Sequence, residues 1–183
     1  SKLASEAVTL AEVLRAVGYQ TAAFSINVNV SSHFGFDQGF GQFDDLVREF
    51  NLKVLHEAHA EYSAHAKTDI VHEKGFEYLL GGELRQPFFV YFHTMDPPAP
   101  YNSNSEFLGS SSLPDIDPEL GTLRSLAEVQ EGKREASDAV LSQIRSLYAG
   151  EVARNDRMFG SLVSELRRLG LYQDTLIIVV SDH

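Results

Sequence analysis

The first regular pattern of apolar and polar positions, near the start of the chain, predicts a helix followed by a strand. Thr9 and Glu12 have the T-x-x-E spacing of a capping box, in which each side chain accepts the backbone N–H of the other residue. Gly18 is suited to end the helix, because glycine adopts the left-handed conformation without strain. We therefore expect a helix over residues 9–17, a short apolar strand over 19–25 and a Gly- and Phe-rich loop after it.

Two later runs of apolar residues predict strands that are buried on both faces. Residues 88–92, behind Pro87, are all apolar and largely aromatic, and residues 175–180 are β-branched or aliphatic throughout. Neither run shows the alternation of apolar and polar side chains found in a half-exposed strand. Continuous runs of this kind are typical of parallel sheets covered by helices. We expect both to be fully buried strands of one sheet.

Helices and one irregular segment are expected between these strands. Residues 52–82 are mostly helical by pattern and stop at a pair of glycines. Apolar residues at a spacing of three and four predict the longest helix over residues 141–169, with Gly170 as its stop. Residues 94–133 hold most of the prolines together with many Ser, Asn and Gly, so we expect an irregular, lid-like excursion there.

The order of these elements predicts a single α/β domain over residues 1–183. Helices that connect successive strands of one sheet make right-handed crossovers, and the strands then run parallel. With 183 residues, 43% of them apolar, the chain can build one sizeable core but not two large ones. The expected fold is a mostly parallel sheet sandwiched by helices.

Charge and composition exclude several classes of partner. The chain carries 26 acidic and 15 basic side chains, for a formal charge of −11, and this surface field repels polyanions. We therefore expect neither nucleic acid nor a membrane as a partner. The absence of cysteine excludes disulfides, thiolate metal sites and a cysteine nucleophile within these residues. No apolar run approaches the ~18 residues of a membrane span or forms a signal-peptide core; neither compartment nor oligomeric state is indicated.

Polar side chains follow all three predicted strands. Asn27 comes after the first strand, His93 and Asp96 after the second, and Asp182 and His183 after the third. The carboxyl ends of parallel strands meet at one edge of the sheet, and α/β sheets bind ligands outside that edge. These residues are therefore the candidate functional site.

Residue types alone leave the chemistry of this edge open. Asp182 and His183 offer a carboxylate and an imidazole nitrogen, which can form half of the shell of a divalent cation. Alternatively, Asp182 caps a following helix and His183 is merely polar. The role of His93 is undecided for a similar reason, because a single histidine at a strand end is often a hydrogen-bonded core group rather than a catalyst.

Other groups of polar residues are weaker candidates. His56 and His59 lack the i, i+4 spacing of the zinc-protease helix. Asp44 and Asp45, on the Gly-rich loop, are expected to cap a helix or to lie in a solvated turn. Glu151 is expected to be solvated or paired along the long helix. No serine has the G-x-S-x-G context of a serine-hydrolase elbow.

Four blocks of the sequence resemble, in the same order, blocks of the type I sulfatases. They are residues 9–24, 34–40, 87–97 and 171–183. The similarity runs over nearly the whole chain, with residues 53–67 and the proline-rich excursion least similar. It implies an alkaline-phosphatase-like α/β catalytic domain, incomplete at both ends of this chain, that hydrolyses a small-molecule or saccharide sulfate ester.

The resemblance also implies a cofactor and a nucleophile. Sulfatases use a divalent cation, usually calcium with magnesium as the alternative, and a formylglycine made from cysteine or serine. The family's metal-binding Asp-His or Asp-Asn pair falls on Asp182 and His183. The nucleophile is expected upstream of residue 1 and a cationic substrate-binding residue downstream of residue 183. This chain alone is therefore expected to be inactive.

Two departures from the family pattern change the expected site. The Gly-Lys-x-His stretch of many members is replaced by residues 25–28, so Asn27 is expected to bind substrate as a neutral donor. In the pattern H-x-x-D-P-H-x-P-Y, His93 and Asp96 match, but the second histidine is Pro98, which offers no hydrogen-bond donor. We expect His93 to supply the missing imidazole as the catalytic residue, and Asp96 to bind substrate.

Two alternatives stay open. Phosphoester and phosphonate hydrolases of the same superfamily use the same layout of metal and nucleophile. A catalytically inactive homologue that keeps the fold for binding is suggested by Pro98 and by the missing Lys-x-His.

Overall fold

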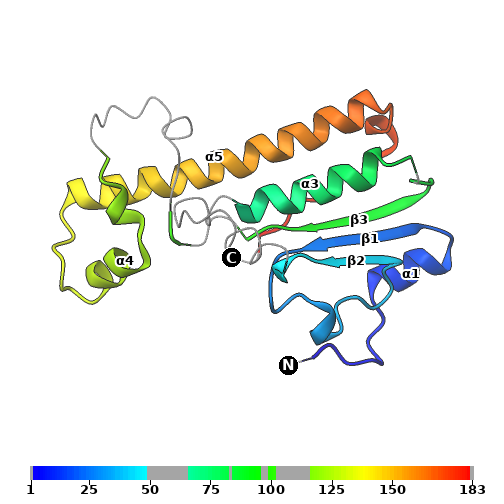
Figure 1. The fold of residues 1–183 in the computed structure, drawn as a ribbon, viewed down its shortest axis with the longest axis horizontal. Helices are drawn as coiled ribbons and strands as arrows, with labels where there is room; N and C mark the ends of the chain where they lie inside the picture. Colours follow the sequence, from blue (N-terminus) through cyan, green and yellow to red (C-terminus); the bar gives the residue numbers. More distant parts are fainter. Residues whose placement is uncertain (1, 49–65, 83, 96–98, 102–115, 182–183) are drawn as a thin grey trace.

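The computed structural model describes residues 2–48, 66–82, 84–95, 99–101 and 116–181. Figure 1 shows a small parallel sheet, helix α3 beside it, and the long helix α5 running along α3 on the side away from the sheet. The elements are α1 (Leu10–Ala16), β1 (Gln20–Ser25), η1 (Ser32–Phe34), β2 (Gln42–Asp45), α3 (Ala66–Leu80), β3 (Phe88–His93), η2 (Pro118–Gly121), α4 (Leu123–Gln130), α5 (Asp138–Arg168) and η3 (Tyr172–Asp174).

The first helix begins and ends as its sequence predicts. Thr9 Oγ1 accepts the backbone N–H of Glu12 at 3.1 Å, and Glu12 Oε2 accepts the backbone N–H of Thr9 at 2.9 Å. Gly18 has a φ of +94° and follows the last turn of α1. The capping box and the glycine stop are confirmed, since both depend only on neighbours in sequence.

The sheet has the strand order β2-β1-β3, with all strands parallel. Ser25 at the end of β1 pairs with Asp45 of β2 and with His93 of β3, so the three strands end at one edge. Strand β2 was not predicted. The expectation of a cap or turn at Asp44 and Asp45 is wrong, because this short segment gains its backbone partners from β1 and not from its own pattern.

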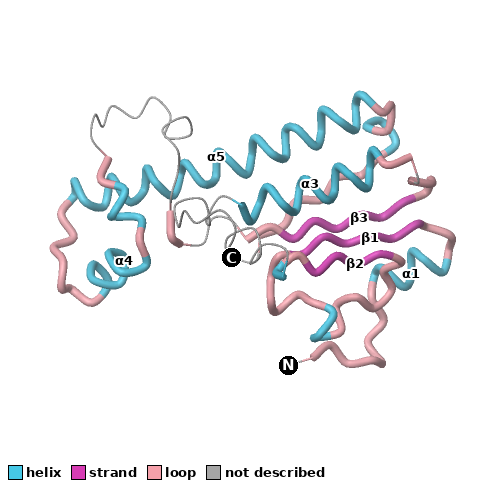
Figure 2. Tube along the Cα trace, in the orientation of Figure 1, coloured by secondary structure: helices cyan, strands magenta, loops and turns pink. Residues whose placement is uncertain are grey.

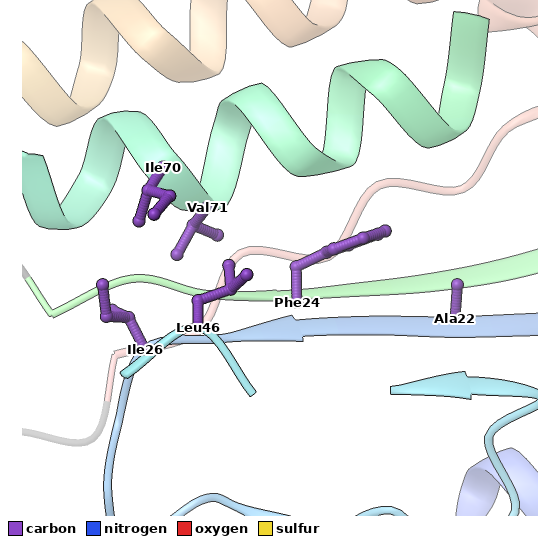
Figure 3. Close-up of a cluster of buried hydrophobic side chains, with 6 residues drawn as sticks. All are labelled: Ala22, Phe24, Ile26, Leu46, Ile70 and Val71. Carbon is purple, nitrogen blue, oxygen red and sulfur yellow. The ribbon is translucent and has the colours of Figure 1, made fainter. Parts of the chain in front are cut away.

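One face of the sheet packs against α3. In Figure 3, Ile70 and Val71 of α3 point toward Phe24 and Ile26 at β1, and toward Leu46. These side chains and Ala22 are each at most 6% exposed. Phe92 of β3 packs on the same cluster. A Cβ atom at Gly75 of α3 would collide with the Phe92 ring, so glycine allows this close approach of helix and strand.

The opposite face is covered by the loop that carries Phe40. Its ring stacks on Phe89 at 5.8 Å and lies 6.5 Å from that of Tyr91, and both belong to β3. Gln38 ties this loop to α1, because its side chain donates to Ala7 O at 2.6 Å and to Glu12 Oε2 at 3.0 Å. Side chains on a strand alternate between faces, so Phe89 and Tyr91 point away from the face that buries Phe92.

The helical predictions are confirmed in part. Helix α5 matches the predicted longest helix. Of the helix expected over residues 52–82, α3 is described from residue 66, and the first half lies outside the described residues. The excursion expected over residues 94–133 holds η2 and α4, whose N-cap Thr122 accepts the backbone N–H of Ser125 at 3.2 Å. Its expected irregularity is therefore wrong for these elements, which carry their own local caps.

The prediction of a third buried strand is wrong. Residues 175–180 form no strand in Figure 2, and the four most exposed side chains there are 71–84% exposed. They are Leu176, Ile178, Val179 and Val180. Within the described part of the chain, no strand pairs with this segment. The sheet is thus a three-stranded part of the predicted α/β architecture, with its two longest described helices on one side.

Candidate functional site

Asn27 and His93 meet at the carboxyl edge of the sheet. Asn27 Nδ2 lies 3.1 Å from His93 Nε2, across the ends of β1 and β3. The backbone holds the two segments together, because Ile26 N–H donates to His93 O at 3.4 Å. The structure therefore brings together two of the predicted site residues. Asp96, Asp182 and His183 lie outside the described residues.

A tight turn after β1 fixes the position of Asn27. The backbone N–H of Asn29 donates to Asn27 Oδ1 at 2.8 Å, and that of Val30 donates to Asn27 O at 2.9 Å. Ser25, which is 1% exposed, accepts the backbone N–H of Asn27 and donates its hydroxyl to Val30 O at 2.6 Å. Asn27 is thus held at its backbone and at its side-chain oxygen.

Tyr91 contacts the other ring nitrogen of His93. Its Oη lies 2.7 Å from His93 Nδ1, and the ring centroids are 5.9 Å apart. Burial raises the pKa of Tyr91 above its ordinary value, so the phenol keeps its proton at neutral pH. The sequence did not single out Tyr91, which lies in an aromatic run typical of a buried strand. The available signal was its place two residues before His93, on the same face of the strand.

This arrangement offers a ligand hydrogen-bond donors and a group that can exchange a proton. Asn27 and His93 are both partly exposed, so a ligand can reach them. An amide supplies neutral N–H donors, and an imidazole can accept or donate a proton near neutral pH. Asp45, at the end of β2, adds an exposed carboxylate to the same edge. The edge therefore offers donors, a proton-exchanging group and an acid within one row of strand ends.

A second polar cluster lies between α3 and α5, behind the sheet. Arg154 forms an ion pair with Asp69, and Glu151 is only 2% exposed, so its expected solvation is wrong. His72 stacks on Phe92 of β3 with centroids 5.8 Å apart. Burial lowers the pKa of His72, and the nearby charge of Asp69 opposes this only in part. The cluster contacts β3 through the ring of His72.

Helix α5 also touches the chain directly after β3. Asn155 Nδ2 donates to Thr94 Oγ1 at 3.5 Å, one residue beyond His93. Among the residues that the structure describes, no three or more His, Cys, Asp or Glu side chains gather closely enough to hold a metal ion. None of the described helices is both long and apolar enough to cross a membrane.

A family model described as Sulfatase matches residues 1–183, which is the whole chain. A search of the curated proteins found no match.

Proposed function

Since the chain belongs to the sulfatase family, we propose that the full-length protein is a metal-dependent sulfatase that acts on a sulfate ester of a small molecule or saccharide. Its nucleophile is a formylglycine outside this chain. The observation that carries the proposal is the contact between Asn27 and His93 at the carboxyl edge of a parallel sheet. Ligands of α/β sheets bind at this edge.

The proposed roles follow from the donors that each side chain has. The bond between sulfur and the ester oxygen breaks as sulfur bonds to a hydroxyl oxygen of the nucleophile. The proton lost by that hydroxyl is balanced by the proton that the leaving alcohol takes up, and release of sulfate from the nucleophile completes the hydrolysis. Asn27 donates an N–H to a sulfuryl oxygen, and Asp96 contributes to substrate binding. His93 exchanges the proton, since imidazole is the side chain best matched to neutral pH.

Asp182 and His183 are proposed to hold the divalent cation, which is calcium, with magnesium as the alternative. A carboxylate oxygen suits either ion, and an imidazole nitrogen suits them less well, so Asp182 is the stronger of the two ligands. The bound cation would neutralise charge on the sulfuryl oxygens.

The test is hydrolysis of an aryl sulfate by the full-length protein and its variants. Asp182→Ala, or removal of the cation with EDTA, is expected to abolish turnover. His93→Gln is expected to lower kcat by about 10²–10⁴-fold. Asn27→Ala is expected to lower kcat/KM by about 10–100-fold, the worth of a hydrogen bond to a charged group. His33→Gln is the matched control, because His33 is exposed and lies in η1, not at a strand end.

The same assay separates the alternatives. Faster hydrolysis of the matched aryl phosphate would replace the sulfatase by a phosphoester hydrolase of the same superfamily. No hydrolysis of either ester, with formylglycine present upstream, would favour a binding protein without catalytic activity. Wild-type rates in His93→Gln would remove His93 from the mechanism.

A further inference from the structure

We infer that Tyr91 is a positioning residue which, together with Asn27, holds His93 as the neutral Nδ1–H tautomer, with the lone pair of Nε2 facing Asn27. This inference rests on the proposed role of His93. It adds two things to that role: the atom that takes part in proton exchange, and the direction in which the proton first moves.

The orientation of the Asn27 amide is decided by the backbone. Asn29 N–H can only donate, and it lies 2.8 Å from one end of the amide, which must therefore be the oxygen Oδ1. The opposite end, 3.1 Å from His93 Nε2, is then the NH₂ group. Oxygen and nitrogen of an amide are told apart by such contacts, and here one contact suffices.

The amide in turn decides the tautomer of His93. An NH₂ group can only donate, so Nε2 must accept and cannot carry a proton. A neutral imidazole then has its single N–H at Nδ1, and this N–H points to Tyr91 Oη at 2.7 Å. The raised pKa of Tyr91 keeps its oxygen as a neutral phenol, which accepts through a lone pair and leaves its own proton for solvent.

This network gives His93 a direction of action. Nε2 has one lone pair, so an O–H group at the reacting centre must first take the place of the Asn27 NH₂ there. The lone pair then accepts the proton of that O–H group, forming an N–H bond while the oxygen keeps the electron pair. Asn27 cannot return to Nε2–H, because two donors cannot bond each other, and can turn its N–H groups to an anionic oxygen. Tyr91 keeps the ring in place, because its bond to Nδ1–H is the same in both states.

A purely structural role for Tyr91 makes a different prediction. The Tyr91 ring packs near Phe40, with centroids 6.5 Å apart, and this packing does not need the hydroxyl. Tyr91→Phe keeps the ring and removes only the oxygen that receives Nδ1–H. Tyr148→Phe is the matched control, since Tyr148 is 45% exposed and Tyr91 is 37% exposed, and Tyr148 lies on α5.

The decisive measurement is solid-state ¹⁵N NMR of the full-length protein labelled at histidine, with the His93 signals assigned by their loss in His93→Gln. The wild type is expected to show a protonated Nδ1 and an unprotonated Nε2. Tyr91→Phe removes the contact that keeps the His93 ring against Asn27. The ring can then turn away from the Asn27 amide, so a mixture of both tautomers is expected, whereas Tyr148→Phe is expected to give the wild-type pattern. Asn27→Asp replaces the donor by an acceptor and is expected to place a proton on Nε2.

Two results would overturn the inference: an unprotonated Nδ1 in the wild type, or a Tyr91→Phe spectrum identical to that of the wild type. Kinetics give a second readout. Tyr91→Phe is expected to lower kcat by about tenfold or more with KM unchanged, the usual effect of losing a partner that orients a functional histidine. If the protein hydrolyses no sulfate ester while the NMR pattern is as expected, the proposed function fails and the positioning by Tyr91 stands.

Discussion

Two segments of this chain are similarly apolar in sequence, but only one of them forms a strand in the structure. Strand β3 is a run of aromatic and aliphatic residues, and residues 175–180 form an equally apolar run. The first pairs along its length with β1 and packs on both faces. The second forms no strand, and Leu176, at 84% exposed, is its most exposed side chain.

The difference lies in the partners and not in the run itself. A strand needs a neighbour that exchanges backbone hydrogen bonds with it, and an apolar face needs a surface that covers it. Strand β3 has β1 beside it, α3 over Phe92 and the Phe40 loop over Tyr91. Apolar composition therefore indicates that a segment can be buried. Only its neighbours decide whether it is.

The partners of β3 also fix the residue that ends it. His93 is held through both ring nitrogens, by Tyr91 of β3 and by Asn27 after β1. This part of the candidate site therefore depends on the pairing of β3 with β1.

The largest effect is expected from truncating the two runs in parallel. Phe92→Ala should lower the free energy of unfolding by about 3 kcal/mol, because the ring fills the space between β3, Phe24 and Gly75. Ile178→Ala should change it by less than about 0.5 kcal/mol, because that side chain is 71% exposed. Urea unfolding of the full-length protein measures both. An equal loss in Ile178→Ala would show that residues 175–180 are buried in solution and would break the comparison.

A second pair of substitutions tests why β3 is covered so closely. Gly75→Ala should destabilise the protein by about 1–3 kcal/mol, since the added Cβ collides with the Phe92 ring. Gly160→Ala on α5 is the matched control, with open space around its Cβ, and should stabilise by up to about 1 kcal/mol through helix propensity. A melting temperature of Gly75→Ala that is unchanged or raised would mean that α3 and β3 can move apart without cost.

The Phe40 loop, which covers the other face of β3, is expected to be held less firmly at acidic pH. The pKa of Glu12 lies below its ordinary value of 4.5. The main cause is the hydrogen bond that its carboxylate accepts from the Thr9 backbone, and the next is the one it accepts from the Gln38 side chain. The stabilisation is present above that value and is lost as the pH falls through the lower pKa of the folded state. Glu12→Gln should be less stable at neutral pH and should lose less stability on acidification. If the stability of the wild type and of Glu12→Gln falls equally with pH, Glu12 does not anchor the Phe40 loop.

The smallest effect is expected behind β3, at His72. Burial holds its pKa below the ordinary value of 6.5, so the folded state favours the neutral ring. Stability is then full above 6.5 and is lost as the pH falls from there toward the folded pKa. His72→Phe keeps the ring against Phe92 and should flatten unfolding profiles between about pH 7 and pH 5. A slope in His72→Phe as steep as that of the wild type would contradict the assignment to His72.

The candidate site could be predicted from the sequence only as far as it follows strand ends. Asn27 and His93 were found because polar residues after buried strands of a parallel sheet share one edge. Tyr91 and Asn29 were missed because one lies inside an aromatic run and the other acts through its backbone N–H. Their roles depend on the register of β1 and β3 and on the turn after β1. Neither the register nor the turn can be predicted from the residue types.

The sequence by itself determined the features that depend on near neighbours. These are the capping box and glycine stop of α1, the two strands β1 and β3, the long helix α5, and the polar residues that follow the strands. Their causes are hydrogen bonds and apolar patterns spanning a few residues. Only the tertiary structure decided that residues 42–45 join the sheet, that residues 175–180 do not, and that His93 lies between Asn27 and Tyr91. The reason is that each of these outcomes depends on contacts between different segments of the chain. A local pattern cannot specify which segment will pair with or pack against which other.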